Sequence, residues 1–164
     1  MRLAADAVLV PVAPKRRAAI LPPAAEDVAG AEALWAELEP CTAAERRMLV
    51  EDLEEYRSWA LCVRVAAESL AKAANHPREA LELAELALLI AELTPGTETW
   101  RSRLQGYAWA HVADSRRVCS DLPGAEEALA CAVKLWEAGA AADPGLLDAA
   151  LLSDRHGGAG AAGG

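Results

Sequence analysis

The stretch Asn75–Thr97, NHPREALELAELALLIAELTPGT, decides the fold class of this chain. It begins with polar residues and Pro77, which suits the first turn of a helix because the amide that proline lacks has no helical acceptor there. Two apolar stripes follow, one of small and one of large side chains: Ala80, Ala84, Ala87 and Ala91, and Leu83, Leu86, Ile90 and Leu93. A helix with two apolar sides must be covered from two directions. We therefore predict a helix from Arg78 to Leu93 inside an all-α fold.

Proline and glycine divide the rest of the chain into further helical segments. We predict helices over 26–39, 42–56, 57–74, 97–119, 125–138 and 146–152. Thr42 and Glu45 form a capping-box pattern that begins the second of these helices. Periodicity predicts the buried faces of two of them: Met48, Leu49, Leu53 and Tyr56 in one, and Trp59, Val63, Ala66, Ala67 and Leu70 in the next. In the helix over 97–119, we expect Trp100, Tyr107 and His111 to face the core.

The composition supports closely packed helices and excludes several classes of protein. Alanine fills 40 of the 164 positions and phenylalanine is absent, which argues against a β-sandwich or barrel. The net charge of −9 argues against sequence-independent binding to nucleic acid or to an anionic membrane surface. No apolar run is long enough to cross a membrane. Four cysteines without metal-ligand spacing fit reduced thiols in the cytoplasm, so we expect no metal and no cofactor.

The predicted organisation has four parts. Residues 1–25 are expected to be a disordered arm, and residues 154–164 a flexible Gly/Ala tail. Residues 26–56 are expected to form N-terminal helices, and residues 57–153 to form stacked helix pairs. Segment Arg78–Glu92 aligns with Pro123–Glu137 in its order of small residues, which indicates an internal repeat.

The second unit of this repeat resembles the tetratricopeptide repeat family. Trp109-x-x-Val112-Ala113 stands where that family has W-x-x-L-G, and Ser120-Asp121-Leu122 resembles its turn. Ala125, Leu129 and Ala132 follow its small, large and small pattern, although Glu68 departs from the pattern in the preceding unit and the repeat is longer than the usual ~34 residues. Trp59 to Leu147 also looks like repeat proteins of GC-rich bacteria. The resemblance implies antiparallel helix pairs stacked as a short right-handed α-solenoid.

In the similar proteins more helix pairs follow, so this chain looks truncated at its C-terminus. The helix over 125–138 then has only the segment 146–152 to cover it. We expect Leu135 and Trp136 to be either partly exposed or covered by a partner or a second copy. Self-association through the C-terminal helices is therefore one expected interaction.

The sequence predicts a non-enzymatic module that binds a peptide or protein partner on the surface of its helical repeats. Arg101, Arg103, Arg116 and Arg117, on the first helix of a pair, are the candidate partner-binding residues. An alternative is a regulatory or sensor segment of a bacterial transcription or signalling system. We expect no catalytic residues: His111 has Asp114 and Ser115 nearby in sequence, but groups so placed on one helix do not face each other across a cleft, and a buried histidine is the simpler interpretation.

Overall fold

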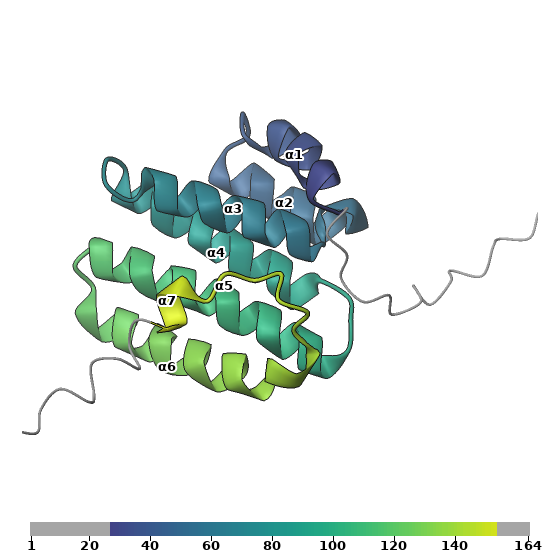
Figure 1. The fold of residues 1–164 in the computed structure, drawn as a ribbon. Helices are drawn as coiled ribbons and strands as arrows, with labels where there is room; N and C mark the ends of the chain where they lie inside the picture. The colour runs from purple at the N-terminus through teal and green to yellow at the C-terminus, as the bar shows by residue number, and fades with distance from the viewer. Residues whose placement is uncertain (1–26, 154–164) are drawn as a thin grey trace, which may run out of the picture.

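The computed structural model describes residues 27–153, in which all regular secondary structure is helical (Figure 1). The helices are α1 (Asp27–Leu38), α2 (Ala43–Asp52), α3 (Trp59–Lys72), α4 (Pro77–Leu93), α5 (Glu98–Val118), α6 (Leu122–Ala138) and α7 (Ala150–Ser153). Two 3-10 turns, Glu54–Tyr56 and Ala140–Ala142, lie between them. The all-α prediction is confirmed for this part of the chain. The predicted arm over 1–25 and tail over 154–164 lie outside the described residues.

Short polar side chains begin most of the helices. The capping box predicted at Thr42 is present: its hydroxyl accepts from the Glu45 amide, and the Glu45 carboxylate accepts from the Thr42 amide. Thr97 caps α5 as predicted. Ser58 caps α3, and this cap separates α3 from the preceding 3-10 turn. Asp121 accepts from the Gly124 amide, so α6 begins at Leu122 rather than at the predicted Ala125.

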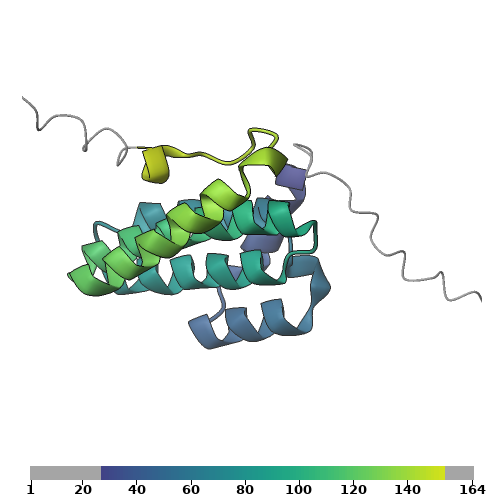
Figure 2. The same ribbon diagram turned by 90° about the horizontal axis from the view of Figure 1, so that it is seen from below.

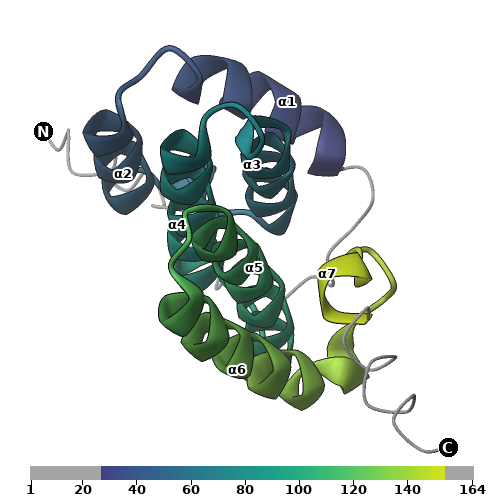
Figure 3. The same ribbon diagram turned by 90° about the vertical axis from the view of Figure 1, so that its left-hand side faces the viewer.

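From α3 to α6, each helix packs against the next one along the chain as an antiparallel neighbour (Figure 1). Viewed roughly along α3, α4 and α5, helices α2, α4 and the start of α6 lie on one side, and the segment bearing α7 lies on the other (Figure 3). Helix α1 packs on α3, α2 packs on α4, and α3 also contacts α5. The predicted N-terminal helices are not separated from the rest, because Trp35 and Leu38 of α1 belong to the same buried cluster as the side chains of α3, α4 and α5.

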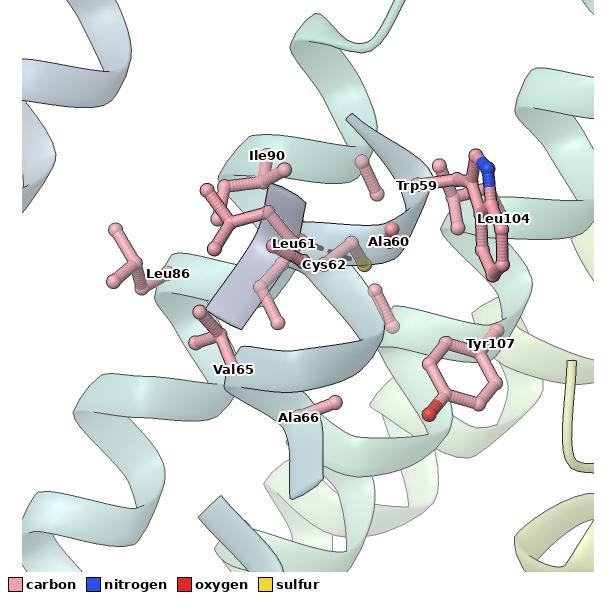
Figure 4. Packing of buried hydrophobic residues seen from close by; sticks show 14 of the residues in the cluster. Trp59, Ala60, Leu61, Cys62, Val65, Ala66, Leu86, Ile90, Leu104 and Tyr107 are labelled. Carbon is pink, nitrogen blue, oxygen red and sulfur yellow. Dashed lines mark hydrogen bonds between the residues drawn. The ribbon is translucent and has the colours of Figure 1, made fainter. Parts of the chain in front are cut away.

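Helix α4 lies at the centre, covered by α3 on one side and α5 on another. Its alanine stripe is fully buried, and the large stripe is buried apart from Leu93, which is exposed. This confirms that two helices cover it. On the α3 side the Cys62 thiol donates to the Ala87 carbonyl, within the apolar cluster around Leu61, Leu86 and Ile90 shown in Figure 4.

Two buried serines join three helices. Ser69 of α3 donates to the Ala80 carbonyl of α4 at 2.6 Å, and its oxygen lies 3.1 Å from that of Ser115 on α5. Ser115 lies 3.4 Å from the same carbonyl. Each buried hydroxyl therefore has hydrogen-bond partners within the protein. These contacts fix the positions of α3, α4 and α5 relative to one another along their axes.

Helix α5 crosses close to α6 at Gly106. A Cβ built on Gly106 would lie 2.5 Å from the Trp136 amide nitrogen and 2.9 Å from the Ala132 carbonyl oxygen. These are backbone atoms of α6, which cannot rotate away as a side chain can. The absence of a side chain at this position therefore sets the separation of the two helices.

The structure corrects the predicted course of the second helix. Helix α2 ends at Asp52 instead of continuing to Tyr56, because Leu53 is extended and a 3-10 turn follows. Met48 and Leu53 are exposed, while Val50 and Arg46 are buried. The predicted face is therefore wrong for Met48 and Leu53, whereas Tyr56 is buried as expected. A buried arginine interrupts the apolar pattern of this helix.

The predicted face of the third helix was also partly wrong. Trp59 and Ala66 are buried as expected, but Ala67 and Leu70 are exposed. The face that packs instead carries Leu61, Val65 and the hydrogen-bonded Ser69. The pattern of apolar residues could not predict this face, because one of its members is a polar residue that donates to a carbonyl of α4.

The segment after α6 returns across the helices on the side opposite α2 (Figure 2). The predicted helix over 146–152 is only the single turn α7, because Asp143 accepts from the Gly145 amide and Gly145 takes a φ of 87°. Leu147 and Leu152 are nevertheless buried, so the segment still covers its neighbours. Within this chain Leu135 and Trp136 are half-buried.

Candidate functional site

Arg103, one of the four predicted partner-binding residues, points into the protein's own C-terminal segment. Its Nε donates to the Asp143 carboxylate at 2.7 Å and one terminal nitrogen donates to the Trp136 carbonyl at 2.6 Å. The guanidinium also stacks 3.2 Å from the centre of the Trp136 ring. With its side chain 14 % exposed, Arg103 has little surface for an external partner.

The other three predicted arginines lie at different places along α5. Arg101, near its start, is exposed and donates to the Glu92 carbonyl. Arg117 is exposed and pairs with Asp114 on the same helix. Arg116 is half-buried and donates to the Gly124 carbonyl. The structure therefore does not bring the four together into one patch.

Arginines instead complete the carboxyl ends of four helices. The last carbonyls of a helix lack helical donors and carry a partial negative charge, which a guanidinium can satisfy. Arg46 donates to Leu38 and Glu39 at the end of α1, and Arg57 to Val50 and Glu51 at the end of α2. Arg101 does the same for α4 and Arg103 for α6. Burial of Arg46 thus has a structural cause.

A groove lined by residues of α2, α4 and α5 combines apolar and charged side chains. It has a volume of about 210 Å³. Its apolar lining consists of Leu88, Leu89, Trp109 and Val112, of which only Val112 is fully buried. Its charged lining consists of Arg47, Glu85, Glu92 and Arg116. We call this the α4 groove.

The α4 groove continues along α2 into a smaller hollow of about 50 Å³ that shares Arg47 and Glu85 with it. Glu82 lines that hollow. Within the described residues, no hydrogen bond or ion pair joins the carboxylates of Glu82, Glu85 or Glu92 to another group. The two arginines, by contrast, already have intrachain partners: Arg116 at the Gly124 carbonyl, and Arg47 loosely at Glu51.

Sequence reasoning found only Arg116 among the residues that line the α4 groove. Leu88 and Leu89 could have been suspected, because they lie between the two predicted stripes of α4 and give that helix a third apolar side. Arg47 could not, since its place in the groove depends on how α2 packs against α4.

His111 is buried, as the sequence predicted, with 4 % of its surface exposed and its ring 4.7 Å from that of Tyr107. Its Nδ1 has no hydrogen-bond partner among the described residues. The Ser115 hydroxyl contacts Ser69 and the Ala80 carbonyl instead, so no nucleophile–base pair forms there. Burial lowers the pKa of His111 from 6.5 to about 4, against smaller opposing effects of Asp114 and Asp148.

This lowered pKa predicts a pH dependence of stability. The unfolded chain binds a proton at His111 below about pH 6.5, whereas the folded chain does so only near pH 4, so stability is lost as the pH falls through this window. We expect His111 to account for about 3 kcal/mol of the loss in unfolding free energy between pH 7 and pH 4. Urea unfolding at a series of pH values, on the wild type and His111→Gln, measures it. The exposed His76, changed to Gln, serves as the control; equal pH profiles for wild type and His111→Gln would contradict the prediction.

Metal-binding clusters and membrane-spanning helices were also sought within residues 27–153. No group of three or more His, Cys, Asp or Glu side chains is placed to hold a metal ion there. No helix in the same range is both long enough and apolar enough to traverse a bilayer. Comparisons with protein-family models, with curated proteins and with solved structures gave no match to this chain.

Proposed function

We propose that this protein is a non-enzymatic interaction module that binds a peptide or protein partner in the α4 groove. The proposal includes the fold: we infer that the helices form a short right-handed α-solenoid of tetratricopeptide-like type. It also includes the location, because we infer that the protein acts in the cytoplasm without a cofactor. Contacts of α1 with α3, of α2 with α4 and of α3 with α5 support it, because pairs of helices stacked in order repeat such contacts.

The observation that carries the proposal is the composition of the α4 groove. Leu88, Leu89 and Trp109 keep part of their apolar surface accessible while charged side chains surround them. An apolar centre with a polar rim is the arrangement found at protein–protein interfaces, where contact with the centre supplies most of the affinity. Helix grooves of this kind accept peptides without covalent chemistry.

Selection of binding peptides tests the proposal. We expect the full chain to enrich peptides from a phage-displayed random library, and Leu89→Gln to weaken the binding of the selected peptides by roughly tenfold, because it removes an apolar contact at the groove centre. Leu122→Gln, at a leucine that is 60 % exposed and outside the groove, is the matched control and should bind as the wild type does.

Thermal unfolding of each variant shows whether it is folded at the temperature of the binding assay. Peptides that bind folded Leu89→Gln as tightly as the wild type would place the binding surface elsewhere. Failure to enrich any peptide would oppose a peptide-binding role.

Self-association forms a second part of the proposal. The outer face of α6, with Glu126, Leu129, Ala130 and Val133 among its residues, is open and partly apolar. A second copy would cover it in the way that a following helix pair would. Light scattering coupled to size-exclusion chromatography distinguishes a dimer from a monomer.

A further inference from the structure

The arginines of the α4 groove would suggest an acidic partner. The arrangement of hydrogen bonds around the groove argues for a basic partner instead. All four arginines singled out from the sequence donate to groups of the protein itself. The unpartnered charges on this face are carboxylates. A partner that approaches the groove therefore meets carboxylates that form no ion pair within the described residues.

These carboxylates have a definite spacing. Glu85 and Glu92 are seven residues apart on α4, which places them on one face about 10 Å apart along the axis. Leu88 and Leu89 lie between them on the same face. The groove therefore presents an apolar patch with a carboxylate one turn before it and another one turn after it, and Glu82 extends the row by a further turn.

The arginines that line the groove and the adjoining hollow form no ion pair with these carboxylates. Arg47 lies 3.9 Å from Glu51, and the two side chains are about half exposed. Arg116 donates to the Gly124 carbonyl. Arg46, which lines the adjoining hollow, is buried with its donors on the end of α1. The net charge of −9 over the whole chain supplies a long-range field that attracts a basic partner.

We propose that the partner of the α4 groove is a basic amphipathic helix that places apolar side chains on Leu88, Leu89 and Trp109 and Lys or Arg on Glu85 and Glu92. The complementary pattern is an apolar residue pair with basic residues at i and i+7 around it, since that repeat matches the two turns between the carboxylates. Opposite charges at the rim raise the association rate and select the partner, while the apolar contact supplies most of the affinity. This inference rests on the function proposed above and adds the chemistry of the partner.

Two fluorescein-labelled helical peptides test it against the full chain by fluorescence anisotropy. Both carry Leu at i+3 and i+4; one has Lys at i and i+7, and the other has Glu there. We expect the Lys peptide to bind at least roughly tenfold more tightly than the Glu peptide, because each peptide charge faces a rim carboxylate. The Glu85→Gln, Glu92→Gln double variant should weaken the Lys peptide about five- to tenfold and leave the Glu peptide no weaker.

A matched double variant separates the groove from the general charge of the protein. Glu54→Gln with Glu55→Gln removes the same charge at two exposed positions away from the groove and should leave binding unchanged. An equal effect of the two double variants would show attraction by net charge alone and overturn the inference. Exposed Glu→Gln changes leave the fold intact, and thermal unfolding verifies this.

Leu89→Gln distinguishes failure of the inference from failure of the proposed function. If both peptides bind with equal affinity, or the Glu peptide binds better, and Leu89→Gln weakens them, the groove binds peptides but its preference for basic ones is wrong. The same holds if peptides selected from a library bind at Leu89 while the Lys peptide does not. If Leu89→Gln changes the affinity for neither peptide, the α4 groove is not the binding surface. That result would contradict both the proposed function and this inference.

Discussion

Replacing Gly106 by valine is expected to lower the free energy of unfolding by about 4 kcal/mol or more, enough to unfold much of the protein at physiological temperature. The reason is the crossing of α5 and α6, where a Cβ would lie 2.5 Å from the Trp136 nitrogen and 2.8 Å from its Cα. The two helices would have to separate along their length, which opens gaps between Ala110 and Ala132 as well. Urea unfolding followed by circular dichroism measures the change.

Alanine at two glycines provides the matched comparison. Gly106→Ala should still destabilise, by about 1–3 kcal/mol, since a single methyl group meets the same backbone atoms. Gly30→Ala on α1 should stabilise by about 0.5–1 kcal/mol, because Gly30 is exposed, has nothing within 4 Å of the new Cβ, and gains helix propensity. If both changes stabilise to the same extent, α5 and α6 are farther apart than the structure shows.

Replacing Arg103 by methionine is expected to lower the free energy of unfolding by about 3–5 kcal/mol. The change keeps most of the apolar stem on the Trp136 ring but removes the only guanidinium that pairs with Asp143 in the described structure. The Asp143 side chain is 7 % exposed, so its charge would stay out of water with no cation beside it. The Trp136 carbonyl would lose its donor at the end of α6. Urea unfolding at neutral pH checks the value.

Two further variants identify the cause. Arg101→Met, at an exposed arginine two positions away, should cost under about 1 kcal/mol. Adding Asp143→Asn to Arg103→Met should recover a large part of the loss, because it removes the buried charge and keeps an acceptor for the Gly145 amide. A double variant as unstable as Arg103→Met alone would show that the loss comes from packing on Trp136 and not from the stranded carboxylate.

The features of the fold that depend on local sequence could be predicted. Proline and glycine mark the breaks between the helices. The residues Thr42 and Glu45 predict the capping box that the structure contains. The four alanines of α4 recur at helical spacing, and they are buried together as this spacing predicts. These features follow from nearest neighbours along the chain and from one helix's own periodicity. Errors arose where a polar side chain lies on a packed face, as Arg46 and Ser69 do, because periodicity treats such residues as solvent-facing.

The candidate site was less accessible to sequence reasoning for a different reason. An arginine on a helix looks available to a partner, and only the fold shows that Arg103 is bound to Asp143 and Arg101 to the end of α4. The groove exists because α2 lies beside α4 and leaves Leu88 and Leu89 half covered. That placement depends on tertiary packing, so the carboxylates and not the arginines remain to meet a partner.

Completion of helix ends by arginine also bears on the order in which this chain can fold. The guanidinium that satisfies the end of α1 is 8 residues downstream of Leu38, that for α2 is 7 residues downstream of Val50, and that for α4 is 9 residues downstream of Glu92. Loops this short close at little entropic cost, and helical proteins dominated by local contacts reach the native state quickly. Each of these three helices can therefore be completed during synthesis as soon as the following arginine has left the ribosome. Helix α6 differs, because the arginine at its carboxyl end, Arg103, belongs to α5 and precedes α6 in the chain. This arginine has therefore left the ribosome before α6 is synthesised.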